Sequence, residues 1–220
     1  KKSMEIVENL IKISENIPEN VSLIAVSKTK SKNHIELAYN HGQRDFGENK
    51  VQELVEKYNS LQKDINWHMI GHLQRNKVKQ IAPFVYLIHS VDSYRLLIEI
   101  NKQGFKNGRI INVLVQIDIS KDNTKFGFTY AEFDELIKLN KLKDLKNINL
   151  KGMMGMASFS SDLSIIEREF NQLNDFYNKH KTNLNLNILS MGMSGDYKIA
   201  IKCNSNMIRL GSTIFGTRIK

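Results

Sequence analysis

One lysine in this sequence stands where an amine could do covalent chemistry. Residues 23–26 form a continuous apolar run, typical of a strand buried on both faces, and Lys28 follows that run by two residues. An amine at the rim of a protein core loses part of its hydration, which favours the neutral form that attacks aldehydes. The alternative is that Lys28 is a solvated surface lysine, as most lysines are.

Two segments near the end of the sequence have the composition of phosphate-binding loops. Residues 190–195 and 209–213 combine glycine with hydroxyl side chains, and each follows an apolar segment. Glycine lets the backbone approach an anion, hydroxyl groups donate hydrogen bonds, and a helix N-terminus offers free N–H groups. Ordinary turns have the same composition, so that alternative stays open.

Arg209 stands inside the short apolar segment 207–210, where a buried guanidinium needs an acceptor. A ring nitrogen of a phosphorylated cofactor would supply one, and so would a structural salt bridge. His68 and His72 are four residues apart, but no glutamate follows the first histidine, so we expect no metal site. Cys203 is interpreted as a core residue, and the methionines at 153, 154 and 156 as core residues or, alternatively, as an adaptable pocket wall.

The order of the elements predicts an α/β fold with a single (β/α)8 TIM barrel. Eight strand-like segments alternate with helical patterns, whereas an open doubly wound sheet usually shows a Gly-rich fingerprint after its first strand, which is absent from this sequence. The predicted strands are residues 21–26, 43–46, 65–70, 85–89, 110–118, 150–154, 186–190 and 207–210. The predicted helices are residues 4–15, 33–41, 51–58, 76–82, 94–101, 129–139, 164–177 and 196–202.

In such a barrel the carboxyl ends of all strands meet on one face. We therefore expect eight residues to surround one pocket, namely Lys28, Asn49, Gly71, Asp92, Asp118, Met154, Ser194 and Gly211. Capping boxes predict the starts of two helices, one from Thr129 to Glu132 and one from Ser164 to Glu167.

Composition bounds the class of protein. A chain of 220 residues with 41% hydrophobic and 25% charged residues suits one globular domain, and no apolar run is long enough to cross a bilayer. The net charge of +9 comes from scattered lysines, so we expect solvated helix faces rather than a nucleic-acid site. A single cysteine predicts a reducing cytoplasm. Lys1 to Ser3, which precede Met4, are expected to be left over from cloning.

Seven segments together resemble the YggS or PROSC family, the pyridoxal phosphate homeostasis proteins. They are AVSKT (25–29), FGENKVQE (46–53), WHMIGHLQRNK (67–77), HSVD (89–92), SMGMS (190–194) with Asp196, IRLGS (208–212) and IFG (214–216). One departure is at Asn204 and Ser205, where the family pattern more often has Gly-Ser.

The resemblance implies a fold-type III barrel, like the N-terminal domain of alanine racemase, over residues 1–220. It also implies pyridoxal 5′-phosphate (PLP) held as a Schiff base on Lys28, with Arg209 facing the pyridine nitrogen. Ser194, Gly211 and Ser212 would contact the phosphate, and Asn49 and Met193 would line the ring pocket. The implied cofactor-binding residues are Lys28, Asn49, Met193, Ser194, Arg209, Gly211 and Ser212, with no catalytic or metal-binding residue.

The resemblance implies a function in PLP storage, delivery and regulation of amino-acid and keto-acid metabolism. The alternative is a PLP-dependent enzyme such as an amino-acid racemase. A protonated arginine beside the pyridine nitrogen weakens the ring as an electron sink, which disfavours transamination but not racemisation. Racemisation needs acid–base groups on both faces of the cofactor, and alanine racemases take one from a tyrosine in a second domain. The sequence ends at Lys220 just after the eighth strand, so we expect negligible turnover.

The expected partners are PLP and, where delivery occurs, PLP-dependent apo-enzymes. The sequence does not identify these enzymes or show whether PLP passes by direct contact. We expect a monomer that binds neither nucleic acid nor membranes.

Overall fold

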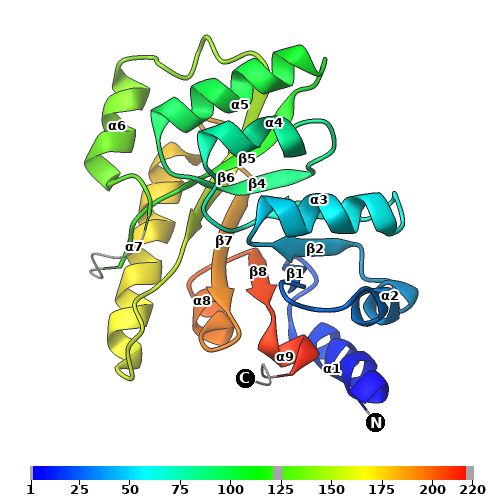
Figure 1. Ribbon diagram of the computed structural model, residues 1–220. Coiled ribbons are helices and arrows are strands. Elements are labelled where there is room, and N and C mark those ends of the chain that lie inside the picture. The colour runs from blue at the N-terminus through cyan, green and yellow to red at the C-terminus, as the bar shows by residue number, and fades with distance from the viewer. Residues whose placement is uncertain (1, 121–125, 217–220) are drawn as a thin grey trace.

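Eight parallel strands close into a barrel in the computed structural model, which describes residues 2–120 and 126–216 (Figure 1). β1 pairs with both β2 and β8, which closes the ring. The predicted (β/α)8 barrel is confirmed. The strands are β1 (Ser22–Val26), β2 (Asp45–Glu48), β3 (Asn66–Met69), β4 (Leu87–Val91), β5 (Ile111–Gln116), β6 (Ile148–Gly155), β7 (Ile188–Met193) and β8 (Met207–Leu210).

Helices surround the barrel and cover the outer face of its strands (Figure 1). α1 contacts α2 and α9, and Asn9 Nδ2 donates a hydrogen bond to the Ile214 carbonyl at 3.0 Å, so the first and last described helices lie side by side. The helices are α1 (Lys2–Asn16), α2 (Lys32–Asn40), α3 (Val51–Ser60), the 3-10 turn η1 (Arg75–Lys77), α4 (Val78–Ile81), α5 (Tyr94–Lys106), α6 (Tyr130–Lys138), α7 (Leu163–Lys181), α8 (Tyr197–Lys202) and α9 (Ser212–Phe215).

Four strands end further along the chain than the sequence predicts. β4 runs to Val91, and three strands reach a glycine or pass through one, β2 to Glu48, β6 to Gly155 and β7 to Met193, so residues 191–193 belong to a strand and not to the predicted loop. Glycine has a low strand propensity, which is why these three predicted strands stop early. Pairing with β6 and β8 nevertheless continues β7, with a register shift between Ser190 and Met193. The loop after β7 is therefore only three residues long, 194–196.

The two predicted capping boxes have different outcomes. The Thr129 side chain accepts from the Glu132 N–H and the Glu132 carboxylate accepts from the Thr129 N–H, so the first box is confirmed. The second box is wrong, because α7 begins after Asp162, whose carboxylate accepts from the Ser164 N–H at 2.9 Å. An ionised carboxylate is a stronger acceptor than a hydroxyl at a helix start.

Apolar side chains form two separate cores. The larger core lies between the strands and the helices and includes Met153 and Cys203, and the smaller one fills part of the barrel interior. Met153 and Met154 contribute to different cores because successive strand residues face opposite sides. The predicted core roles of Cys203, Met153 and Met154 are thus confirmed. The smaller core consists of Ile24, Leu87, Leu114, Met154 and Met207.

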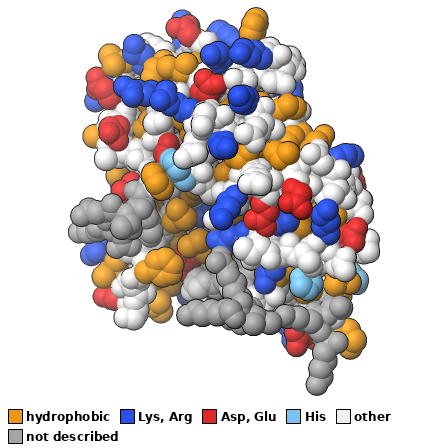
Figure 2. Space-filling model, viewed as in Figure 1, with side chains coloured by type: hydrophobic (Ala, Val, Ile, Leu, Met, Phe, Trp, Pro, Cys, Tyr) orange, Lys and Arg blue, Asp and Glu red, His pale blue; other side chains and the backbone are white. Residues whose placement is uncertain are grey.

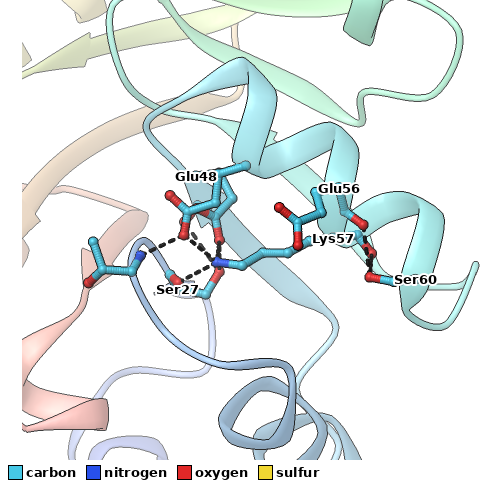
Figure 3. A network of polar contacts seen from close by, with 8 residues as sticks. Ser27, Glu48, Glu56, Lys57 and Ser60 are labelled. Atoms are coloured by element: carbon cyan, nitrogen blue, oxygen red, sulfur yellow. Dashed lines mark hydrogen bonds and ion pairs between the residues drawn. The ribbon is translucent and has the colours of Figure 1, made fainter.

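A buried lysine of α3 anchors the carboxyl end of β1 (Figure 3). Lys57 Nζ donates to the Ser27 carbonyl at 2.7 Å, to Glu48 Oε1 at 2.6 Å and to Glu53 Oε1 at 2.7 Å. Lys57 is 5% exposed and Glu48 is fully buried. Taking these charges out of water is compensated only because each has close partners of opposite charge. The network therefore ties β1, β2 and α3 together.

The same network fixes the backbone on both sides of Lys28. The carbonyl of Ser27 accepts from Lys57, and the N–H of Thr29 donates to Glu53 Oε1 at 2.6 Å. Thr29 has φ of 64°, a left-handed conformation that is uncommon for a β-branched residue and must be held by its surroundings. Lys28 thus leaves the sheet from a backbone segment with little freedom.

Glu48 is the surplus carboxylate of this network, because two carboxylates face one ammonium group. Burial raises the pKa of Glu48 from its ordinary value of 4.5 to about 7, although Lys57 and the Ser27 hydroxyl oppose the shift. The negative charge of Glu53 adds to the increase. Glu48 therefore takes up a proton near neutral pH when the protein is folded.

The connection from α8 to β8 explains the one departure from the family pattern. Asn204 has φ of 69° and follows the last residue of α8 by two positions. The Asn204 N–H bonds to the Ile201 carbonyl and the Ser205 N–H to the Ala200 carbonyl, which is a Schellman motif. Glycine adopts this conformation most readily, and asparagine is among the few other residues that tolerate it.

We predict that the Asn204→Gly variant is more stable than the Asn204→Ala variant. Asn204→Ala places a Cβ in the left-handed region without a polar group, so its free energy of unfolding should be about 1 kcal/mol below that of Asn204→Gly. Chemical denaturation of the two variants measures the difference.

The matched control is Gln172, an exposed residue inside α7. There the order should reverse, with Gln172→Ala more stable than Gln172→Gly by about 1 kcal/mol. An Asn204→Ala variant as stable as Asn204→Gly would contradict the assigned backbone conformation.

We also predict a pH dependence of stability that comes from Glu48. Between pH 4.5 and about 7 the unfolded chain carries an ionised Glu48 while the folded protein holds the proton, so the free energy of unfolding falls as pH rises through this window. The full change is about 3 kcal/mol at about 1.4 kcal/mol per pKa unit. Urea denaturation of wild type and Glu48→Gln from pH 5 to 8 measures it as the difference between the two slopes.

The control variant is Glu56→Gln, which removes an exposed carboxylate from α3, the helix that carries Lys57 (Figure 3). It should keep the wild-type slope. Equal slopes for wild type and Glu48→Gln would show that Glu48 does not exchange its proton in this range.

Candidate functional site

A cavity of about 380 Å³ opens at the carboxyl ends of the strands, on the face where the loops after β1, β2, β7 and β8 meet. Its volume lies within the range of about 300–1,000 Å³ typical of small-molecule pockets. All seven residues predicted to bind the cofactor line it: Lys28, Asn49, Met193, Ser194, Arg209, Gly211 and Ser212. The structure therefore brings together residues that are up to 184 positions apart, from 28 to 212.

Four of the eight expected strand-end residues lie elsewhere. Asp92 accepts a hydrogen bond from His72 at 3.0 Å, and Asp118 pairs through its backbone with Phe128. Met154 belongs to β6 and packs in the small core, because that strand is longer than predicted. Gly71 lies behind Asn49.

Gly71 shapes the site indirectly. A Cβ at position 71 would lie only 2.3 Å from the Asn49 carbonyl oxygen, so the loop after β3 can pass there only without a side chain. This close approach supports the backbone of Asn49, which follows β2 and lines the cavity. The structure thus gives Gly71 a packing role instead of a place in the lining.

Lys28 reaches the cavity from the fixed segment after β1. Its side chain is half-buried, in agreement with the expected position at the rim of the core. The peptide groups of Ser27 and Thr29 are held by Lys57 and Glu53, so α3 controls where the amine lies.

The loops after β7 and β8 are joined by one hydroxyl group. Ser194 Oγ accepts from the N–H groups of Gly211 and Thr213, each at 3.3 Å. This oxygen occupies the start of α9, where N–H groups lack helical partners. A serine hydroxyl also carries one proton, which it can donate to another oxygen. The arrangement is suited to an anion such as phosphate.

Arg209 brings a positive charge to the inner wall of the cavity. It is 3% exposed and donates to Ser190 Oγ and to the Gly155 carbonyl, at 3.3 Å for the carbonyl. Burial lowers the pKa of Arg209 to about 10, while the negative charge of Asp196 opposes the change. The guanidinium therefore stays protonated at neutral pH. Its two acceptors are neutral oxygens, so the charge is not cancelled by them.

Seven further residues line the cavity: Val26, Lys30, Ile70, Met156, Phe159, Gly195 and Gly216. Gly195 belongs to the predicted phosphate-binding segment 190–195, and Met156 is one of the methionines for which a pocket wall was the alternative to the core; the other five were missed. Lys30 is a second amine beside Lys28, and it donates to the carbonyls of Phe215 and Gly216 at 3.3 and 3.4 Å. Its two-residue spacing from Lys28 was a possible signal for Lys30. Phe159 is 90% exposed at the mouth.

Metal binding finds no support in residues 2–120 and 126–216, where no group of three His, Cys, Asp or Glu side chains could hold an ion. His68 and His72 contact different partners, Asp45 and Asp92.

Comparisons with known proteins identify the family of this chain. The family profile "Alanine racemase, N-terminal domain" matches residues 3–219. A pyridoxal phosphate homeostasis protein of Pasteurella multocida is 38% identical over 231 residues, which cover 98% of each chain. One from Escherichia coli K12 is 35% identical over 229 residues, which cover 97% of each.

Solved structures give the same picture. PipY of Synechococcus elongatus PCC7942, solved with PLP bound, has a TM-score of 0.88 at 32% identity. The match covers 96% of this chain and 100% of the PipY chain. Alanine racemase of Clostridium difficile 630 has a TM-score of 0.79 at 18% identity, and this chain covers 57% of it, so it shares the fold. With relatives above 30% identity along nearly their whole length, the chain belongs to the family of pyridoxal phosphate homeostasis proteins.

Proposed function

We propose that this protein binds PLP in the cavity at the carboxyl ends of the strands and acts in PLP homeostasis. The observation that carries the proposal is the meeting of an amine, an anion-binding loop pair and a buried guanidinium in one cavity of about 380 Å³. These groups match the aldehyde, the phosphate and the ring nitrogen of PLP, which sit on different sides of one small ring. PipY, the relative solved with PLP bound, supports the assignment.

Lys28 is the proposed attachment point. Once deprotonated, its amine would attack the aldehyde carbon of PLP and form a C=N bond, and the aldehyde oxygen would leave as water. This reversible Schiff base needs no oxidant or second substrate. Because the backbone around Lys28 is fixed by Lys57 and Glu53, the amine is held ready in position.

Ser194, Gly211 and Ser212 are the proposed phosphate contacts. The Ser194 hydroxyl can donate to a phosphate oxygen, and the loop after β8 leads directly into α9, whose first N–H groups favour anions. Asn49 and Met193 are proposed to flank the ring, since both line the same cavity as Lys28 and Arg209.

Arg209 is proposed to face the pyridine nitrogen. Its pKa of about 10 keeps it protonated at neutral pH, so it donates to that nitrogen and does not supply it with a proton. A ring that stays unprotonated is a weaker electron sink, which disfavours transamination. This supports storage and delivery of PLP as the function, without substantial catalysis.

The second candidate is a racemase-like enzyme, favoured by the fold shared with alanine racemases. Racemisation needs groups that exchange protons on both faces of the cofactor. Among the described residues, Lys28, Lys30 and Arg209 are the titratable side chains that line the cavity. Arg209 stays protonated, so among these three side chains the two lysines are the ones that could exchange protons with a substrate. We propose that turnover is negligible.

We further propose that the protein is a monomer, that it lies in the cytoplasm, and that it supplies PLP to PLP-dependent apo-enzymes. The single cysteine, Cys203, is buried and free, which suits a reducing compartment. None of the helices in the described ranges is long and apolar enough to span a membrane. Lys and Arg side chains on the visible face alternate with acidic ones instead of forming one basic patch, which argues against nucleic-acid binding (Figure 2).

We predict that wild-type protein mixed with PLP develops a visible Schiff-base absorbance band and that Lys28→Ala loses essentially all of it. The loss is expected because Lys30, the other amine among the described lining residues, bonds to the carbonyls of Phe215 and Gly216. Absorbance of the purified proteins after removal of free PLP measures it. Lys50→Ala, which removes an exposed lysine just outside the cavity, should keep the band. A persistent band in Lys28→Ala would contradict the assignment.

We predict that the PLP-loaded protein does not exchange the α-proton of alanine faster than its Lys28→Ala variant with equal PLP. Proton NMR in deuterated water follows the signal loss. Exchange at a turnover near the typical enzyme value of about 10 s⁻¹ would favour the racemase-like alternative. The two lysines would then be the first candidates for the acid and the base.

A further inference from the structure

A continuous thread of polar side chains crosses the barrel interior beneath the cavity. Arg209 on β8 donates to Ser190 Oγ on β7, and Ser190 Oγ lies 3.1 Å from His89 Nδ1 on β4. His89 Nε2 lies 2.8 Å from His68 Nδ1 on β3, and His68 Nε2 lies 2.9 Å from Asp45 Oδ1 on β2. The four inner residues are 0–3% exposed.

We assign the ring protons so that every hydrogen bond of the thread is satisfied. Arg209 has only donors, so Ser190 Oγ accepts from it and turns its own proton toward His89 Nδ1. His89 then carries its proton on Nε2 and donates to His68 Nδ1. His68 in turn carries its proton on Nε2 and donates to the Asp45 carboxylate. Every link is satisfied when both histidines are neutral and Asp45 is ionised.

The electrostatics of the thread agree with this assignment. Burial lowers the pKa of His89 well below its ordinary value, and the positive charges that His68 and Arg209 can carry add to the effect. His89 therefore stays neutral at physiological pH. It must then donate through one nitrogen and accept through the other.

The outer end of the thread reaches solvent on the opposite side of the barrel. The Asp45 side chain is 34% exposed and lines a second cavity of about 390 Å³ at the amino ends of the strands. Asn66 Nδ2 also donates to Asp45 Oδ1, at 3.2 Å, and the Tyr86 ring packs near His68. Lys151 lines the same cavity and is the positive group there.

We propose that Ser190, His89 and His68 are positioning residues that orient Arg209 and couple it to the Asp45 carboxylate at the far mouth of the barrel. A chain of hydrogen bonds that ends on a carboxylate polarises each link toward that charge. Ser190 Oγ thereby becomes a better acceptor and holds the guanidinium in one orientation. The effect of Arg209 on a bound ring then depends on a residue outside the cofactor cavity.

The first test uses the protein without cofactor and does not depend on the proposed function. Nitrogen-15 NMR of the histidine rings should show His68 and His89 as Nε2–H tautomers at pH 7. Asp45→Asn keeps an acceptor but removes its charge, so it should shift the His89 ring signals two links away. Ser190→Ala should shift them as well, because His89 Nδ1 loses its donor.

Asn187→Lys is the matched control. Asn187 lines the same far cavity outside the thread, and the substitution changes the local charge by the same +1 as Asp45→Asn. It should leave the His89 signals in place. A proton on His89 Nδ1, a doubly protonated His89, or equal shifts in Asp45→Asn and Asn187→Lys would each overturn the relay.

The second test rests on the proposed function, since it reads the pH midpoint of the visible absorbance with PLP bound. Losing the negative charge in Asp45→Asn should lower this midpoint by roughly 0.3–1 unit, with a smaller change in Asn187→Lys. An unchanged midpoint in Asp45→Asn would refute the coupling to the site. Absence of any band in wild type would instead refute the proposed function, and the ring NMR would still decide the relay.

Discussion

The ammonium group of Lys57 sits among three oxygen acceptors, and the position of Lys28 depends on it. Moving a lysine out of water costs several kcal/mol, so Lys57 stays buried only while Glu48, Glu53 and the Ser27 carbonyl surround it. This requirement fixes α3 against the ends of β1 and β2. The segment that presents Lys28 therefore has one conformation, which includes the left-handed backbone of Thr29.

Polar groups organise the inside of the barrel by the same rule. TIM-barrel interiors are usually layers of branched apolar side chains. Here a small apolar core shares the space with His68, His89 and Ser190, each of which must find partners because unpaired polar groups are costly when buried. Their chain of hydrogen bonds ends on Arg209 at the cavity. Alanine racemases share the barrel fold. The fold by itself does not determine which polar side chains lie inside the barrel, and function depends on those side chains.

The sequence predicts the barrel and the main site residues because their signals are local. Lys28 follows a buried strand, and residues 209–213 join an arginine to a Gly-Ser loop. Lys57 gives no such signal, because its i,i+4 spacing from Glu53 is typical of an exposed helix face. Residues 191–193 were assigned to a loop, since Gly192 lowers strand propensity while pairing with β6 and β8 keeps these residues in β7. His68 and His89 meet only through the closed barrel, which sequence spacing does not reveal.

We propose that PLP is attached to Lys28 between the phosphate loops and Arg209. Borohydride reduction of the PLP-loaded protein converts the C=N bond into a stable secondary amine, and peptide mass mapping then locates it. We expect one pyridoxyl adduct, on the peptide that contains Lys28. An adduct on Lys30, or adducts spread over surface lysines, would contradict it.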